Sequence, residues 1–526
     1  MKVLITCSGL GQRMGIYTKY TNKSLLKIGD NYVLDYIIEL FKNINNVEFV
    51  ITLGYYGDFI KQYIELAYSH LNVTFVTIDK YSGIGSSLAY SLLKVKDIIQ
   101  EPFIYITCDT IIKDKLNYDK NYKITSNKVY VNKHNSSLNY ASIICNKNNV
   151  LSFNHKNNQN FDYIYIGKSE IYDYEIFWNE LEKVYNADKN NSSIGDVDVY
   201  INMLKNTKFQ YKVVENYYDS GNVSIFNSKI SKNNEYDVLV KADESISFQK
   251  ETVVKFFHDK TKNLKRVERQ KYLNNIIPKI IANTENFHIM EKIPVRPISE
   301  NIENDIIKRL LDWANVNLWI KNDKPENFYE TLYKFYYDKT MTRVKMALEN
   351  SNINDYTTIN KKYIGTIHEL ISSIDFGLLC NADAYNYHGD FILENILMKD
   401  NKFLLIDWRE DFGGDLKNGD IYYDLSKLKH NIYLNHKNIE DGLFSIADEE
   451  NNSCTVTLKC NYNLISQIKQ FEEFVTNNNF NNDKINIIMS LIWINMAPLH
   501  DYPLSAFLFN FGKYNLYNYN QKITNQ

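Results

Sequence analysis

The stretch Val3-Leu4-Ile5-Thr6-Cys7-Ser8-Gly9-Leu10-Gly11-Gln12-Arg13-Met14-Gly15 decides the fold of the N-terminal half. An apolar, β-branched run is followed at once by closely spaced glycines and a basic residue. This order predicts a buried strand that ends in a turn, where backbone N–H groups can approach a ligand closely. Glycines after a strand are also common in ordinary βα turns, so a function depends on the residues that accompany them.

Around this stretch, short apolar runs alternate with amphipathic ones. The pattern predicts strands over 2–6, 48–53, 73–78 and 103–107, and helices over 33–43, 59–69 and 86–94. Such alternation is typical of an α/β fold with a parallel sheet, which binds ligands at the carboxyl ends of its strands. Gly83 and Gly85 fall just before a predicted helix, so we expect their backbone N–H groups to lie at this ligand site. The less regular strands between 123 and 227 predict a mixed-sheet extension.

Length, charge and cysteine usage limit the class of protein. With 526 residues the chain should hold several domains, and its net charge of −3 offers no basic field for nucleic acid or an anionic membrane. Its cysteines form no C-x-x-C pair, which argues against a zinc site or a disulfide framework. We therefore expect a cytoplasmic protein that acts on small molecules, without nucleic acid and without stable membrane insertion. The sequence leaves its oligomeric state open.

A wider set of residues accompanies the first glycine loop. Arg13 and Lys23 follow it, Asp109 follows the strand over 103–107, and Asp219 lies in Tyr218-Asp219-Ser220-Gly221. In this order they resemble the nucleotidyltransferases that activate sugar phosphates and phosphocholine. The resemblance implies a Rossmann-like domain with a GT-A-like mixed sheet.

The same resemblance implies roles for these residues. Gly9 and Gly11 would contact the triphosphate, Arg13 and Lys23 would be catalytic cations, and two aspartates, Asp109 and Asp219, would bind Mg²⁺. CTP is the favoured nucleoside triphosphate. Three positions depart from the family pattern: Gln12, Asn22 and the pair Cys7-Ser8.

The polar run over 227–235 shows no periodicity and predicts a domain boundary. We assign residues 1–230 to the nucleotidyltransferase-like domain and 231–526 to a second domain, with a small lobe at about 240–296 and a helical lobe at about 297–526. In the small lobe the pattern predicts strands over 245–248, 252–257 and 287–293 and a helix over 266–275. From residue 302 onward it predicts helices, interrupted by one strand pair over 396–398 and 403–407.

A second motif lies in the helical lobe. His388-Gly389-Asp390 is followed five positions later by Asn395, and a predicted strand ends at Asp407. This spacing resembles the aminoglycoside phosphotransferase and choline kinase group, which implies a bilobal, protein-kinase-like fold. By that resemblance Asp390 would accept the proton of the acceptor hydroxyl, and Asn395 and Asp407 would hold Mg²⁺. The resemblance also gives Asp424, further along the chain, a supporting role.

The small lobe would then bind ATP. Lys255 would contact the α and β phosphates, Glu268 would pair with Lys255, and Glu291 would border the adenine. The loop over 243–251 contains no glycine, so any phosphate cover must come from Ser245, Ser247 or Gln249. The triplet Asp411-Phe412-Gly413 spells a protein-kinase motif but does not end a strand, so a protein kinase is the weaker interpretation.

Together the two motifs favour a bifunctional enzyme. One half would phosphorylate a small alcohol or sugar with ATP, and the other would couple the product to a nucleotide, giving an activated precursor for cell-surface polysaccharide or lipopolysaccharide. One alternative is a single activity with the other domain degenerate and regulatory. Another is a glycosyltransferase fused to a kinase, although Asp109-Thr110-Ile111 lacks the second aspartate that such an enzyme normally needs.

Overall fold

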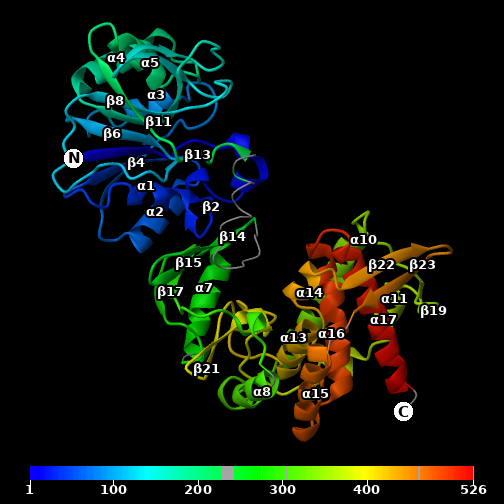
Figure 1. Ribbon diagram of the computed structural model, residues 1–526. Helices are drawn as coiled ribbons and strands as arrows, with labels where there is room; N and C mark the ends of the chain where they lie inside the picture. Colours follow the sequence, from blue (N-terminus) through cyan, green and yellow to red (C-terminus); the bar gives the residue numbers. More distant parts are fainter. Residues whose placement is uncertain (224–225, 227–241, 274, 304, 460–461, 525–526) are drawn as a thin grey trace. The chain divides into compact units, whose positions relative to one another are not determined.

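The computed structural model describes residues 1–223, 226, 242–273, 275–303, 305–459 and 462–524. The chain forms two compact units (Figure 1): Met1–Asn263 with Ile281–Lys292, and Leu264–Ile280 with Ile293–Gln526. The predicted boundary between residues 230 and 231 lies outside the described residues, so the domain limits stay a prediction.

A nine-stranded mixed sheet of order β5-β4-β1-β6-β11-β8-β12-β10-β9 forms the centre of the first unit. Its first four strands run parallel: β5 (Asn72–Thr77), β4 (Glu48–Leu53), β1 (Lys2–Thr6) and β6 (Phe103–Thr107). Thr6 pairs with both Thr52 and Thr107, so the carboxyl ends of β4, β1 and β6 are level. This order matches one half of a Rossmann-like sheet and confirms the predicted α/β fold of the N-terminal half.

The remaining strands make the predicted mixed extension: β8 (Asn127–Asn132), β9 (Ser142–Asn146), β10 (Asn149–Asn154), β11 (Tyr163–Ile171) and β12 (Phe209–Val213). Helices α1 (Val33–Glu39) and α2 (Gly57–Ala67) cover one face of the sheet. On the other face lie α3 (Leu88–Leu93), α4 (Tyr174–Ala187) and α5 (Asp196–Met203) (Figure 1). The alternation of side chains along β1 serves both layers, since Val3 and Ile5 join the α1–α2 core and Leu4 joins the opposite one.

A second, four-stranded antiparallel sheet also packs within the first unit. It consists of β14 (Glu244–Phe248), β15 (Thr252–Phe257), β17 (Phe287–Glu291) and β16 (Ile280–Asn283), in that order. Phe256 and Phe287 contact Phe59 and Tyr63 of α2, with ring centroids 5.1 and 5.7 Å apart. The small sheet therefore shares a hydrophobic core with α1 and α2.

The helix predicted over 266–275 is placed wrongly. Helix α7 spans Lys260–Arg269 and gives way to a 3₁₀ turn at Gln270–Tyr272. The carboxylate of Asp259 accepts a hydrogen bond from the Thr261 amide at 2.9 Å, which satisfies an orphan donor of the first turn and explains the earlier start.

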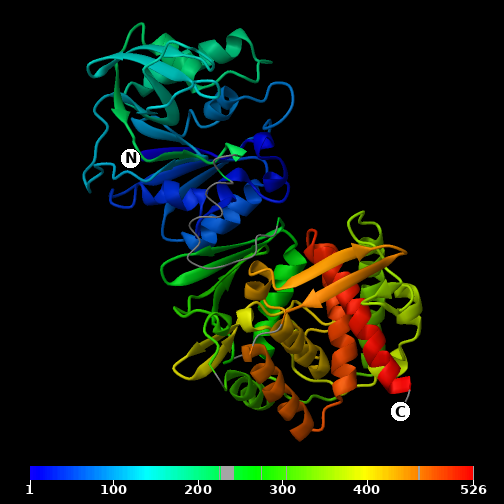
Figure 2. The same ribbon diagram turned by 45° about the vertical axis from the view of Figure 1, so that its right-hand side comes forward.

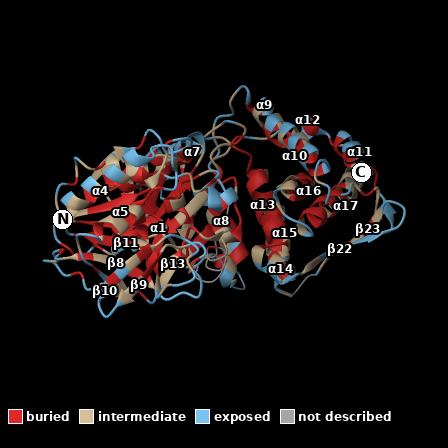
Figure 3. Ribbon diagram, turned by 90° about the horizontal axis from the view of Figure 1, so that it is seen from above, coloured by how far each residue is buried: buried red, intermediate tan, exposed pale blue. Residues whose placement is uncertain are grey.

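The second unit is mainly helical. Its helices are α8 (Ile306–Asn317), α9 (Phe328–Tyr333), α10 (Lys339–Leu348), α11 (Ile367–Ser372), α12 (Phe376–Leu379), α13 (Ile421–Tyr433), α14 (His436–Glu440), α15 (Tyr462–Asn477), α16 (Asn482–Met496) and α17 (Leu504–Thr524). The buried α16 packs against α13 and α17 (Figures 2 and 3). No helix among the described residues is long and apolar enough to cross a membrane.

Strands β20 (Ile396–Lys399) and β21 (Lys402–Leu405) form the predicted strand pair. The prediction missed a second sheet made of β18 (Thr358–Ile359), β19 (Lys362–Tyr363), β22 (Phe444–Glu449) and β23 (Ser453–Leu458). Asn451 and Asn452 both have positive φ in the turn between β22 and β23. An Asn-Asn pair before alternating Thr and Val is a hairpin signal that could have revealed this sheet.

Candidate active sites

Asp109 and Asp219 meet at the carboxyl edge of the large sheet. Strand β13 (Tyr217–Asp219) pairs with β7 (Thr110–Ile112), and the Ser220 amide donates to the backbone oxygen of Asp109 at 3.0 Å. A Cβ atom at Gly221 would lie 2.9 Å from Asp109 Oδ2 and 3.0 Å from Asp219 Oδ1. Both carboxylates therefore border one point of the backbone, where a side chain larger than that of glycine would displace them.

The two predicted cations lie at the same place. Lys23 Nζ is 2.9 Å from Asp109 Oδ2, and a guanidinium nitrogen of Arg13 would be 3.4 Å from a Cβ at Gly221. Burial alone would raise the pKa of Asp109, but Lys23 lowers it to about 2. Burial, and then the charge of Asp109, raise the pKa of Asp219. The structure thus brings together all four charged residues of the first predicted site.

Asn22 has a structural role in this site. Its Nδ2 donates to the backbone oxygens of Cys7 at 3.0 Å and Tyr55 at 2.7 Å, and its Oδ1 accepts from the Ser24 amide at 2.9 Å. These bonds tie the short 3₁₀ turn Lys23–Leu25 to the ends of β1 and β4. The departure from the family pattern therefore positions Lys23 by side-chain hydrogen bonds.

The four predicted glycines lie in two loops, one after β1 and one before α3. Gly11 has a φ of 66°, and a Cβ there would lie 3.0 Å from Thr18 Cγ2. Nothing lies within 4 Å of a Cβ at Gly9, and Gly83 and Gly85 have φ values of 78° and 81°. The backbone conformation thus favours glycine at three of the four positions, and their contact with a nucleotide stays a prediction.

Two features of this site were not predicted. Tyr140 interacts with Asp219, whose charge contributes after burial to the raised pKa of Tyr140, and no sequence signal links these distant residues. The buried thiols of Cys7 and Cys108 interact with each other beside Lys23. Each cysteine directly follows one of two paired strands, which is the signal that could have placed them together. Cys460 lies outside the described residues.

In the second unit, the loop after Asp390 brings the predicted residues together. Asn395 Nδ2 donates to the backbone oxygen of Asp390 at 3.0 Å and to its Oδ2 at 3.1 Å. The Ile406 amide donates to the backbone oxygen of Asn395 at 2.9 Å, which places the end of β21 beside this loop. Asp407 follows with a φ of 58°, an uncommon conformation for a residue with a side chain.

The carboxylates of Asp390 and Asp407 each form an ion pair with a basic side chain that was not predicted. Lys427 Nζ lies 2.7 Å from Asp390 Oδ1 and lowers the pKa of Asp390 to about 2, although burial would raise it. Arg266 forms an ion pair with Asp407. Lys427 follows Asp424 by three positions on α13, a spacing that puts both on one helix face and could have indicated it. No pattern pointed to Arg266.

Asp424 and His388 support the loop that carries Asp390. The carboxylate of Asp424 accepts from the amides of His388 at 2.8 Å and Gly389 at 2.7 Å, and from Trp319 Nε1 at 3.1 Å. Burial lowers the pKa of His388 to about 4. The neutral ring then accepts at Nδ1 from the Asp390 amide and donates from Nε2 to the backbone oxygen of Ile406.

The predicted ATP-binding residues are divided between the units. Lys255 is buried in β15, and Glu291, which is exposed, ends β17 in the first unit. Glu268 belongs to the second unit, where it pairs with Lys271 at 2.8 Å. The pairing of Lys255 with Glu268 stays a prediction.

The serines expected to cover the phosphates have other partners within the first unit. Ser245 Oγ is 2.7 Å from Tyr32 Oη, Ser247 Oγ is 3.4 Å from Asp35 Oδ2, and Gln249 Nε2 is 3.3 Å from the Tyr63 hydroxyl. The hydrogen-bonding groups expected to cover the phosphates therefore contact α1 and α2.

The donor sets of both sites fit Mg²⁺. Among the described residues, no group of three His, Cys, Asp or Glu side chains is placed to hold a metal. Mg²⁺ is commonly bound by one or two carboxylates, with water and substrate phosphates completing its shell. Asp109 with Asp219 supplies such a pair, and Asn395 with Asp407 supplies an amide and a carboxylate.

The N-terminal half resembles the nucleotidyltransferases of sugar phosphates and phosphocholine. Over 75 residues, 14% of this chain, it is 35% identical to a protein of Bacillus subtilis (strain 168) named probable glucose-1-phosphate cytidylyltransferase. The match spans 30% of the length of that curated relative. No protein-family model matches the chain.

Solved structures of similar proteins match less than half of the chain. The CTP:phosphocholine cytidylyltransferase from Streptococcus pneumoniae is 18% identical with a TM-score of 0.38, over 44% of this chain and 97% of that one. The inositol-1-phosphate CTP transferase from T. maritima is 15% identical with a TM-score of 0.33, over 44% and 97% of the two chains.

Proposed function

We propose that the chain is a bifunctional enzyme that activates a small alcohol or sugar in two steps. The second unit would transfer the γ-phosphoryl group of ATP to a hydroxyl of the acceptor. The first unit would then join the phosphorylated product to a nucleoside monophosphate from a nucleoside triphosphate, with CTP favoured. The activated product would serve the decoration of a cell-surface polysaccharide or lipopolysaccharide.

The observation that carries the proposal is the meeting of Asp109, Asp219, Lys23 and Arg13 around Gly221. Two carboxylates and two cations at one sheet edge suit a reaction between two phosphate groups. In nucleotidyl transfer a phosphate oxygen of the acceptor attacks the α-phosphorus, and the bond to pyrophosphate breaks. Lys23 and Arg13 would bind the anionic oxygens and offset the charge on the departing pyrophosphate.

When bound, Mg²⁺ would neutralise phosphate charge and align the reacting groups, held by Asp109 and Asp219 in the first unit and by Asn395 and Asp407 in the second. In the second unit Asp390 would accept the hydroxyl proton, and Asn395 keeps the Asp390 carboxylate in position by a hydrogen bond. Lys427 keeps that carboxylate ionised, as a proton acceptor must be.

The contacts of Ser245, Ser247 and Gln249 favour a second candidate function. Because these side chains bond within the first unit, the second unit could be a regulatory domain attached to a nucleotidyltransferase with a single activity. In that case ATP would not be turned over.

The test uses the purified full chain with Mg²⁺, ATP, CTP or UTP, and a panel of alcohols, sugars and their phosphates, followed by mass spectrometry. The bifunctional proposal expects a phosphorylated acceptor and then its nucleotidyl derivative. Nucleotidyl transfer from supplied phosphates without any phosphorylation would favour the second candidate. Absence of both products would contradict both candidates.

A further inference from the structure

Basic side chains gather beside Asp390 in the second unit. Lys339 and Arg343 lie on α10, Arg409 follows β21 and Lys427 lies on α13. Lys339 and Arg409 lie against the same ring, that of Phe335, and burial, followed by the charges of Arg409, Lys427 and Arg343, lowers the pKa of Lys339 well below its usual value. We call Lys339, Arg343 and Arg409 the cation cluster.

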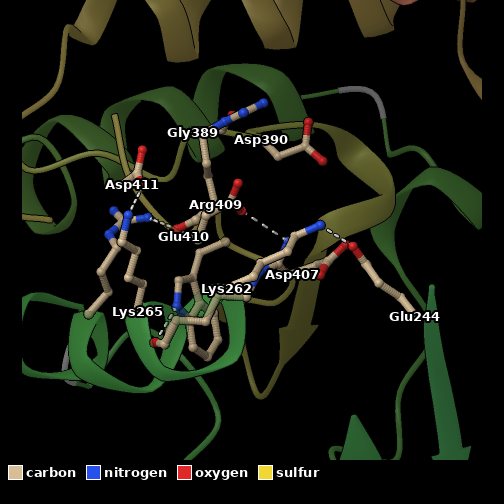
Figure 4. Close-up of polar contacts among 12 residues, drawn as sticks. Glu244, Lys262, Lys265, Gly389, Asp390, Asp407, Arg409, Glu410 and Asp411 are labelled. Atoms are coloured by element: carbon tan, nitrogen blue, oxygen red, sulfur yellow. Dashed lines mark hydrogen bonds and ion pairs between the residues drawn. The ribbon is translucent and has the colours of Figure 1, made fainter. Parts of the chain in front are cut away.

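The acidic groups near the cation cluster are already paired. Asp390 pairs with Lys427, and Asp407 pairs with Arg266. Glu410 attracts Lys339 and Arg409, but its carboxylate pairs with Arg266 at 3.7 Å. Asp411, further along, pairs with Lys265 at 2.7 Å (Figure 4).

Across the part of the chain that the structure describes, no carboxylate forms an ion pair with Lys339, Arg343 or Arg409. Arg409 Nε donates instead to the backbone oxygen of Gly389 at 3.1 Å (Figure 4), and its Nη2 to the Tyr423 hydroxyl at 3.4 Å. Arg266 is shared by Asp407 and Glu410, so the four carboxylates have only three paired cations, and at most two positive charges of the cluster remain in surplus near the predicted proton acceptor.

Aromatic rings contact two members of the cation cluster, Lys339 and Arg409. Lys339 Nζ lies 4.2 Å from the ring centroid of Phe335, and the Arg409 guanidinium carbon lies 5.5 Å from it. Tyr423 lies 5.6 and 5.8 Å from the same two groups. Phe335 belongs to a π-helical segment, Lys334–Asp338, which is an uncommon geometry found often at functional sites. Ring contacts restrict the cations without neutralising them.

We infer that the acceptor alcohol of the second unit carries an anionic group, a carboxylate or a phosphate, which the cation cluster binds while a hydroxyl of the acceptor faces Asp390. Positive charges crowded in a partly buried place repel one another, and an anion would offset that cost. This inference rests on the proposed kinase function of the second unit. It disfavours choline and ethanolamine, whose positive charge the cluster would repel.

The reaction itself is ordinary phosphoryl transfer. The acceptor oxygen forms a bond to the γ-phosphorus of ATP, the bond to ADP breaks, and the hydroxyl proton passes to the Asp390 carboxylate. No oxidant or other co-reactant is needed. The partly exposed Asp390 side chain, at 30% accessibility, leaves room for such a hydroxyl.

The test compares related acceptors that carry a negative, zero or positive charge, using the full chain with ATP and Mg²⁺. One series is glycerate, glycerol 3-phosphate, glycerol and 3-amino-1,2-propanediol, and the other is gluconate, glucose 6-phosphate, glucose and glucosamine. We expect kcat/KM for an anionic member to exceed that of its neutral and cationic partners at least tenfold. Preference for a carboxylate or for a phosphate member would identify which anion the cluster takes. A neutral or cationic acceptor with the highest kcat/KM would overturn the inference and leave the kinase function standing.

Two variants test the cluster directly. Lys339→Met should raise KM for the anionic acceptor about tenfold or more and leave KM for ATP unchanged, while Lys339→Arg should restore most of the affinity. The matched control is Lys345→Met, since Lys345 lies on the same helix with a side chain that is 78% exposed. An unchanged acceptor KM in Lys339→Met would contradict the inference.

Calorimetric binding of the same compounds separates this inference from the proposed function. Anionic members that bind wild type but not Lys339→Met, without being phosphorylated, would support the cation cluster as an anion site and contradict the kinase. If no member of either series binds or reacts, both the inference and the kinase function are contradicted.

Discussion

The two candidate sites use the same charge arrangement but differ in where the cation comes from. In the first unit Lys23 holds Asp109 at 2.9 Å, and in the second Lys427 holds Asp390 at 2.7 Å. Each lysine lowers the pKa of its carboxylate to about 2 against the effect of burial. Lys23 belongs to the motif that predicted its site, whereas Lys427 lies on a helix outside the predicted motif.

The difference shows which part of a site a short motif encodes. The first motif contains its own counter-charge, so its electrostatics were predictable once its strands were assigned. The second motif contains only the predicted proton acceptor and the predicted metal ligands. The cations that pair with its carboxylates lie outside the motif, on α7 and α13. If the two sites work independently, a substitution that inactivates one site should leave the activity of the other unchanged.

The largest effect is expected for Asp109→Asn. Loss of one metal-binding carboxylate should reduce nucleotidyl transfer about a thousandfold, equivalent to about 4 kcal/mol of transition-state stabilisation. The measurement is pyrophosphate release from CTP with a supplied phosphorylated acceptor. Phosphorylation by the second unit should remain within twofold of wild type, and its loss would show that the sites are not independent.

Asp390→Asn provides the reverse comparison. Without its proton acceptor, the second unit should form ADP about a hundredfold more slowly. The asparagine retains one oxygen and the size of the side chain, so the fold should survive. Coupling of a supplied phosphate should continue at the wild-type rate. ADP formation at an undiminished rate would remove Asp390 from the reaction.

Much of the first unit could be predicted because the residues of its motif directly follow the ends of predicted strands. Strands β1, β4 and β6 have the predicted bounds, and the parallel arrangement brings the residues that follow them to one edge. The meeting of Asp109 with Asp219 could be predicted only through the family resemblance. It depends on the pairing of β7 with β13, two short strands with no periodic signal of their own.

The second unit was less predictable because its contacts join distant segments. The ion pair of Arg266 with Asp407 links residues 141 positions apart, and nothing local to either residue indicates the other. The helix start at Lys260 is marked by a single hydrogen bond that the Thr261 amide donates to the Asp259 carboxylate. Local pattern therefore predicted the motif, and tertiary packing decided its partners.

A smaller effect, on stability, is expected for Asp424→Ala. The substitution leaves the amides of His388 and Gly389 and the indole N–H of Trp319 without an acceptor in a buried place. We expect the free energy of unfolding of the second unit to fall by about 3 kcal/mol, measured by urea denaturation. Asp424→Asn, which keeps one acceptor oxygen, should lose less. Equal stability of wild type and Asp424→Ala would show that water replaces these bonds.

The smallest expected effect is on how stability changes with pH. It compares Lys23 with Lys168, a buried lysine for which no role was predicted. Lys168 is fully buried, and burial lowers its pKa to about 7. An unfolded chain binds a proton at this lysine up to about pH 10.4, so between pH 7 and 9 the unfolded state holds more protons and stability rises with pH. The gain should be about 2 kcal/mol.

Lys168→Met should remove this rise, since the Met side chain does not titrate. Urea unfolding of both proteins at pH 7, 8 and 9 measures the difference, and subtracting the variant cancels groups that titrate in both. Lys23 should show no such rise, because Asp109 holds its pKa above the usual value. A pH slope that survives in Lys168→Met would mean that this lysine stays charged in the core, as Lys23 does at the sheet edge. Burial would then not be enough to remove the charge of a lysine in this protein.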